Sequence, residues 1–196
     1  MFVDEMNLVQ MDISQFSYSE CRIKLAVDDW ELQQAQALRK KVFVVEQGIF
    51  QHSDHDLFDS SADTLVATTG MLGIPDAVVG TVRIHQQEPG VWMGSRLAVD
   101  HSFRADKGLG KALIRMAIGS ARARGCKAFY ANVQVQNVAL FQKLGWQAVG
   151  EVTVHGVVHM FMQADLGLYP VVQDPTCGFV HLLKQSGRTA SIRERA

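Results

Sequence analysis

A short stretch between residues 104 and 111 combines three cationic side chains with two glycines. Its sequence is Arg104-Ala105-Asp106-Lys107-Gly108-Leu109-Gly110-Lys111, and apolar residues at helical spacing follow it. The first amides of a helix have no partner within the helix, and the helix dipole adds partial positive charge there. Because glycine has no side chain, an anion can approach this backbone closely. The stretch predicts an anion-binding turn sized for a pyrophosphate, with a plain strand-to-helix turn as the alternative.

Acidic residues gather after the hydrophobic run Val42–Val45. Glu46 ends that run, and a polar loop with Asp54, Asp56 and Asp59 follows. These acids predict an electropositive acceptor such as a polyamine or another amino compound, although they could equally cap the loop. His52 and His55 lie beside them, but the spacing matches no familiar ligand set, so we expect no metal.

Two residues are candidates for accepting a proton. An acid at position 46 could bind an ammonium group and take its proton, although Glu46 could instead pair with Arg39 or Arg83. His159 is the second candidate, because an imidazole with a pKa near 6.5 suits proton transfer at neutral pH. The alternative for His159 is a strand histidine whose hydrogen bonds are all satisfied.

Length and composition exclude several classes of protein. The chain has 196 residues and a net charge of −1, which indicates one domain and neither nucleic acid nor an anionic membrane as a partner. No apolar run approaches the ~18 residues of a membrane span, and the first 20 residues resemble no signal peptide. Three cysteines at distant positions predict reduced thiols, so we expect a cytoplasmic protein.

The apolar periodicity predicts alternating strands and helices. Residues 1–20 are expected to form an arm, 21–165 the domain, and 166–196 a tail or a strap across it. Within the domain we expect strands at 21–27, 63–69, 77–86, 90–99, 127–135, 146–154 and 159–165, and helices from Asp28, over 109–124 and over 137–144.

Several motifs occur in this order and resemble those of one family. They are Leu97-Ala98-Val99 with Asp100, the Gly108-Leu109-Gly110 turn, Asn137, and Phe141-Gln142-Lys143-Leu144-Gly145-Trp146. Together they resemble the GCN5-related N-acetyltransferases, which use acyl-CoA, over about residues 21–165. The resemblance implies an α+β fold with a mixed, twisted sheet of six to seven strands, flanked by helices and splayed at the cofactor cleft.

Two further segments are similar to a narrower group. Residues 38–47 with Asp54 and Asp56, and the ending Gly156–Met162, resemble a subgroup that shares its front end with acyl-homoserine-lactone synthases. The front end is most similar to acetyltransferases associated with bacterial nitrogen-starvation gene sets. Two positions depart from the family pattern: Ala105 replaces a usual Gln or Arg, and Phe141 replaces a tyrosine that protonates the leaving thiolate.

The resemblance implies roles for individual residues. Acetyl-CoA would lie between the strands at 91–99 and 127–134, with its thioester and pantetheine arm bonded by the backbone of residues 97–99. Residues 104–111 would hold the pyrophosphate, and Asn137 and Phe141 would line the arm. Glu46 and His159 are the catalytic candidates, and a small-molecule amine would lie against Arg39, Phe43, Asp54 and Asp56. Whether the protein is a homodimer is left open.

Two other functions stay open for this sequence. A lactone synthase of the same fold would use an acylated carrier protein and S-adenosylmethionine, and would not need the glycine turn. A CoA-binding sensor or interaction module without turnover is the second alternative, and Phe141 is the residue that favours it.

Overall fold

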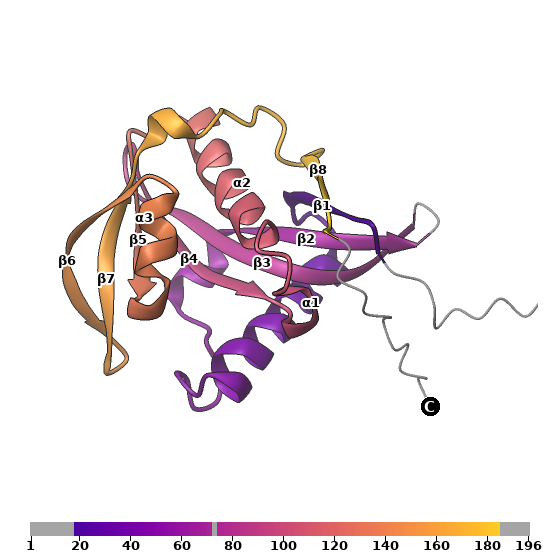
Figure 1. Ribbon diagram of the computed structural model, residues 1–196, viewed down its shortest axis with the longest axis horizontal. Coiled ribbons are helices and arrows are strands. Elements are labelled where there is room, and N and C mark those ends of the chain that lie inside the picture. The colour runs from indigo at the N-terminus through magenta and orange to yellow at the C-terminus, as the bar shows by residue number, and fades with distance from the viewer. Residues whose placement is uncertain (1–17, 72–73, 185–196) are drawn as a thin grey trace, which may run out of the picture.

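The computed structural model describes residues 18–71 and 74–184, which form one mixed sheet of eight strands and three α-helices (Figure 1). The helices are α1 (Asp29–Arg39), α2 (Leu109–Ala123) and α3 (Val138–Lys143). The strands are β1 (Glu20–Leu25), β2 (Asp63–Met71), β3 (Ile74–Glu88), β4 (Val91–Val99), β5 (Ala128–Gln134), β6 (Trp146–Val154), β7 (Val157–Ala164) and β8 (Phe179–Leu182). Their order in the sheet is β6-β7-β5-β4-β3-β2-β1-β8. The mixed sheet confirms the expected fold class, with one strand more than expected.

Helices cover both faces of the sheet, with α1 below it and α2 above it in Figure 1. On the α1 face, Ala35 and Leu38 pack against Val66 and Ala98. On the α2 face lies the larger core, which includes Leu113, Met116, Phe129, Trp146 and Met162. No helix within the described ranges is long and apolar enough to cross a membrane.

Helix α1 begins and ends in ways that shape the site. Its start is a capping box, as predicted, in which Asp28 and Glu31 satisfy each other's backbone amides. At its end the chain continues as a π-helix over Lys40–Glu46, where the Gln47 amide bonds to the Val42 carbonyl, five residues back, at 3.0 Å. Wide turns of this kind are frequent at functional sites. Here the turn buries Phe43, whose side chain lines the cavity described below.

Strands β4 and β5 separate after a short parallel pairing. The paired residues run only from Val91–Ala128 to Gly94–Ala131, although β4 continues to Val99 and β5 to Gln134. A register shift between β3 and β4 sets Arg96 and Leu97 of β4 opposite the single residue Val82. This is a β-bulge, and Arg96 has the left-handed φ of 54°. A bulge bends its strand, so it contributes to the separation of β4 from β5.

The segment after Asp165 crosses α2 and ends as the eighth strand. The Val172 amide donates to the Gly119 carbonyl at 3.1 Å, and a Cβ on Gly119 would lie only 2.6 Å from Val172, so glycine permits this close crossing. β8 then pairs antiparallel with β1. Four residues are too few to show the alternation by which longer strands are predicted. Residues 1–17 and 185–196, which belong to the predicted arm and tail, lie outside the described residues.

Tyr169 ties this crossing segment to the domain. Its buried hydroxyl accepts from Trp146 Nε1 at 2.9 Å and donates to the Leu144 carbonyl at 2.6 Å. Tyr169→Phe would leave two buried polar groups without a partner, so we expect it to lower the free energy of unfolding by about 1–3 kcal/mol. Chemical denaturation measures this change. Leu182→Ala, at an exposed position of the same segment, is the control and should change it by less than about 0.5 kcal/mol.

Candidate active site

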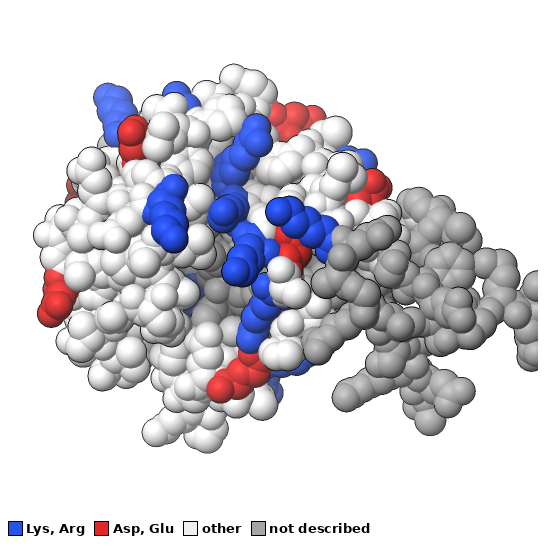
Figure 2. Space-filling view, in the orientation of Figure 1, with Lys and Arg blue, Asp and Glu red and all other residues white. Residues whose placement is uncertain are grey.

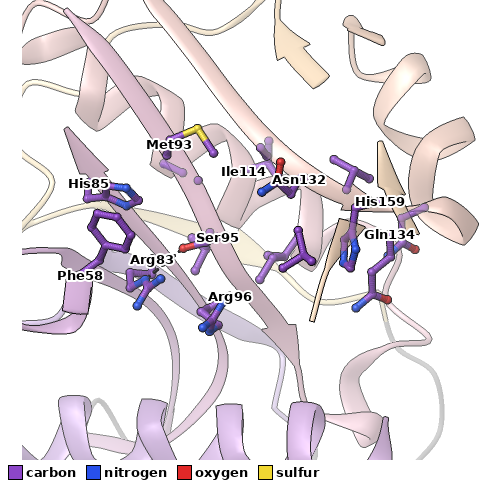
Figure 3. Close-up of a pocket in the computed structure, with 18 of the residues that line it drawn as sticks. Phe58, Arg83, His85, Met93, Ser95, Arg96, Ile114, Asn132, Gln134 and His159 are labelled. Carbon is purple, nitrogen blue, oxygen red and sulfur yellow. Dashed lines mark hydrogen bonds between the residues drawn. The ribbon is translucent and has the colours of Figure 1, made fainter. Parts of the chain in front are cut away.

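A cavity of about 410 Å³ opens where β4 and β5 separate. On the α2 face its wall comes from Ile114, Ala117 and Phe141. On the α1 face it is lined by aromatic residues, including Phe43, and by polar residues of β3, β5 and β7. In Figure 3 His85 and Phe58 lie on one side of β4, and Asn132, Gln134 and His159 lie on the other. The cavity therefore connects the two faces of the sheet.

Six of the residues predicted from sequence line this cavity. They are Phe43, Asp56, Leu97, Asn137, Phe141 and His159. The other predicted residues lie outside the lining. They are Arg39, Glu46, Asp54, Ala98, Val99 and residues 104–111.

Asp54 and Arg39 are buried partners, each only 2% exposed. Arg39 Nε lies 2.6 Å from Asp54 Oδ2, and Arg39 Nη1 lies 2.6 Å from Asp59 Oδ1. On its other side, Asp54 Oδ2 accepts from Arg96 Nε at 3.1 Å. An ammonium group could reach Asp54 only by breaking these ion pairs. The structure thus places Arg39 and Asp54 behind the cavity wall and not on it.

Arg83 closes these pairs into a ring of six alternating charges, the charge ring. Its Nη1 and Nη2 bind Asp56 at 2.7 and 2.8 Å, and Nη1 also lies 3.0 Å from Asp59 Oδ1. Arg96 completes the ring through Nη2, 3.0 Å from Asp56 Oδ2. The ring members are Arg39, Asp54, Arg96, Asp56, Arg83 and Asp59.

The charge ring neutralises the acids that the sequence offered to a cationic acceptor. Burial alone would raise the pKa of Asp56, but the hydrogen bonds and charge of Arg83, the Phe58 amide and the charge of Arg96 together outweigh burial and hold that pKa below its usual range. The pKa of Asp59 is likewise lowered, chiefly by Arg39 against burial. Among the described residues no three His, Cys, Asp or Glu side chains converge as metal ligands. Asp56 is the ring carboxylate that also lines the cavity.

Glu46 forms an ion pair away from the cavity. Its Oε2 lies 2.5 Å from Arg104 Nη2, and Arg104 Nε donates to the Val99 carbonyl at 2.9 Å. The partner is therefore neither Arg39 nor Arg83. This geometry links the end of the π-helix to the end of β4, and it does not bring the Glu46 carboxylate to the reacting centre.

His159 is buried and lines the cavity. Its Nδ1 lies 2.9 Å from the carbonyl oxygen of Val157. A carbonyl oxygen only accepts, so Nδ1 must hold the proton and Nε2 is the basic nitrogen of the neutral ring. The arrangement leaves His159 able to accept a proton.

The sequence interpretation missed several polar residues of the cavity wall. Arg83 and His85 stand two apart on β3, inside a run that is buried from Val78 to His85. A charged and an ionisable side chain on one face of an otherwise apolar strand is a signal that could have identified them. The others are Gln87, Ser95, Arg96, Asn132, Gln134 and His155.

In the predicted anion-binding turn, the amide of the first glycine has a hydrogen-bond partner and the amide of the second does not, among the residues that the structure describes. The Gly108 amide donates to Asp106 Oδ1 at 2.7 Å, and the Leu109 amide bonds to the Asp106 carbonyl at 3.2 Å. Asp106 is buried, so the turn's own acid occupies the position expected for a phosphate. Within the described part of the chain, the amides of Gly110 and Lys111 have no hydrogen-bond partner. An anion site at this turn therefore begins at Gly110 and not at Gly108.

Cationic side chains surround the start of α2. Lys107, in the turn before α2, is exposed, and the exposed Lys111 and Arg115 lie four residues apart on one face of the helix. Figure 2 shows Lys and Arg side chains gathered over this region, beside a hollow in the surface. The charge and the open amides together favour an anionic ligand here.

The lowered pKa values in the charge ring predict acid sensitivity. Folded Asp56 and Asp59 have pKa values below the ~3.9 of an unfolded chain, so their stabilisation is present above about pH 4 and is lost as the pH falls through the folded values. We expect Asp59→Asn to lower the free energy of unfolding by about 2 kcal/mol at pH 7 and to show a weaker loss below pH 4. Denaturant titrations between pH 7 and pH 3 measure both effects. Asp29→Asn, at an exposed position, should keep the wild-type pH dependence.

Comparison with known proteins identifies the fold and the family. An Escherichia coli protein, ElaA, is 20% identical with a TM-score of 0.62, covering 76% of this chain and 100% of its own. A Lactobacillus plantarum protein assigned as an N-acetyltransferase is 22% identical with a TM-score of 0.65, covering 74% and 98%. The CoA-dependent acyl-homoserine lactone synthase BjaI is 18% identical with a TM-score of 0.60, covering 74% and 83%. These likenesses concern the fold. The profile of the acetyltransferase (GNAT) family matches residues 22–146, and the chain belongs to that family.

Proposed function

We propose that the protein transfers the acetyl group of acetyl-CoA to the primary amine of a small molecule by direct attack. The observation that supports this most is the cavity between β4 and β5. The cavity joins the sheet face covered by α2, a helix whose start carries cationic side chains, to the opposite sheet face, where imidazole side chains line it. A transferase that brings an anionic donor and an amine together needs both ends and a passage between them.

The residues around the cleft fit the donor. Beyond Gly94, β4 has no partner strand on its β5 side among the described residues, so its backbone groups can bond an extended arm. Phe141 and Asn137 line the same cleft. The open amides of Gly110 and Lys111, with the exposed Lys107 and Arg115, would hold the phosphates. The donor supplies an activated acyl group, and the chain binds and orients it.

The chemistry requires a neutral amine and a place for its proton. A neutral imidazole in the cavity wall can take that proton, and the candidates include His159, through its basic Nε2, and His85. Glu46 is held by Arg104, so the geometry ranks it below His159. Phe141 has no proton to give, so the departing thiolate would take one from solvent.

The acceptor side constrains the amine. Since the charge ring neutralises Asp54 and Asp59, Asp56 is the acid left at the cavity wall, and Arg83 binds it. This favours an acceptor with a single amine over a polyamine. Phe43 and Phe50 supply apolar contact area for it. The likeness of the front end to bacterial nitrogen-starvation acetyltransferases, and a cytoplasmic location, belong to the same proposal.

A second candidate function is a lactone synthase, favoured by the fold likeness to BjaI. That function needs S-adenosylmethionine as the acceptor. If the exposed cations at the start of α2 bind the phosphates of CoA, they favour a CoA donor over an acylated carrier protein. Binding of acetyl-CoA can be measured.

One titration separates these functions. Acetyl-CoA, and separately S-adenosylmethionine, is added in a thermal-shift assay, and thiol release is then followed with the twenty amino acids, spermidine and histamine as acceptors. Stabilisation by acetyl-CoA with thiol release supports the proposal. Stabilisation without release on any amine indicates a sensor. A response to S-adenosylmethionine, with or without one to acetyl-CoA, indicates the synthase.

Gly110→Glu tests the donor site. A Cβ at Gly110 meets no atom within 4 Å, so the fold should tolerate the change, whereas a carboxylate beside the open amides should repel phosphate. We expect the Kd for acetyl-CoA, measured by calorimetry, to rise at least tenfold. Gly110→Gln, of the same size without charge, is the control and should weaken binding clearly less. Equal effects of the two variants would place the phosphates elsewhere.

A further inference from the structure

His85 is a buried imidazole without a protein partner. The residue is 7% exposed, and its Nδ1 has no hydrogen-bond partner among the described residues. Buried polar side chains are nearly always hydrogen-bonded, because an unpaired one costs about 1–3 kcal/mol. Its side chain lines the cavity, so the ring can face a ligand bound there.

The surroundings of His85 keep it neutral and fixed in orientation. Burial lowers its pKa, and the positive charge of Arg83 lowers it further, while Asp56 acts weakly in the opposite direction. Its ring stacks on Phe58 at 4.2 Å between centroids and 20° between planes (Figure 3). Phe58 belongs to the 3-10 turn Leu57–Ser60, which the charge ring holds through Asp56 and Asp59. The imidazole is therefore a neutral acceptor in a preset position.

The sheet register places His85 beside the point where the strands part. His85 pairs with Met93 of β4, one residue before the last parallel pair, Gly94–Ala131. His159 pairs with Gln134, three residues beyond Ala131, about 10 Å farther along at the rise of a strand. The start of α2, where the phosphates would bind, follows the Val99 end of β4. The pantetheine arm would run from that end along β4, so its thioester end would reach the point near Gly94 where β4 and β5 part. We take the thioester to lie at the parting point and not, as the family resemblance implied, at residues 97–99; there it lies nearer to the level of His85 than to that of His159.

We propose that His85, and not His159, accepts the proton of the attacking amine. This inference rests on the proposed acetyl transfer. The amine nitrogen forms a bond to the thioester carbon, the carbon–sulfur bond breaks, and the sulfur leaves with the electron pair. The amine proton passes to the free lone pair of the His85 imidazole, which later releases it to solvent. The thiolate takes one proton from solvent, so one proton moves in total from nitrogen to sulfur.

The test compares pH profiles of matched variants. The probe is the acceptor of the panel above with the highest thiol release in the wild type. Since His85 must be neutral to act, wild-type kcat/KM should fall as the pH drops below its pKa, which lies under 6.5. We expect His85→Gln to lower kcat/KM at least 100-fold and to remove the His85 contribution to this acid limb, so that only the fall from protonation of the amine itself remains, with the Kd for acetyl-CoA within twofold of wild type. His159→Gln should keep the acid limb, and His52→Gln, an exposed histidine outside the cavity, should match the wild type.

Each remaining outcome decides against the inference or in favour of it. A His85→Gln variant within threefold of the wild type, or loss of the imidazole contribution to the acid limb only in His159→Gln, overturns the inference but leaves acetyl transfer standing. A wild type that turns over no amine removes the proposed function and this inference with it. If His85→Gln does not fold, His85→Ala is assayed with added imidazole. Recovery of turnover then supports the inference, and no recovery overturns it.

Discussion

Three arginines and three aspartates close a ring of alternating charges at the edge of the cavity, and the geometry of the site depends on it. The ring connects the last residue of α1, two neighbouring strands and the loop before β2 through Arg39, Arg83, Arg96 and their aspartates. Each guanidinium lies between two carboxylates, which compensates for the desolvation of buried charge. Removing one member would leave each of its two neighbours with a single partner and the ring with a net charge, so the six residues act as one unit.

The charge ring acts on the cavity through two contacts. Its ion pairs hold the Arg96 side chain while the Arg96 backbone has a left-handed φ, which non-glycine residues rarely adopt. The ring thereby fixes the bulge of β4. It also holds the turn that carries Phe58 against the sheet, where Phe58 stacks on His85. The passage between the strands and the orientation of the imidazole beside it thus have one common origin. Electrostatics sets the shape here, and apolar packing on the α2 face only supports it.

The fold was predictable where its causes are local. The capping box at Asp28, the apolar face of α2 and the alternation in β1 each lie within a few residues, so a single sequence shows them. Strand β8 was not predicted, because its register is set by pairing with β1, more than 150 residues away. The site divides in the same way. Asp54, Asp56 and Asp59 look alike in the sequence, and only their arginine partners, up to 42 residues away, distinguish a buried structural acid from a cavity wall.

The two glycines of the anion-binding turn show how such ambiguity is resolved. Asp106 takes the Gly108 amide and also binds His181 and the Lys184 amide, so this acid joins the turn to the end of β8. A Cβ on Gly108 would lie 2.8 Å from the His181 ring, so packing alone requires a glycine there. At Gly110 a Cβ would meet nothing, and glycine is a poor residue for the first turn of a helix. Packing therefore explains the first glycine but not the second, which has open space around its Cβ position.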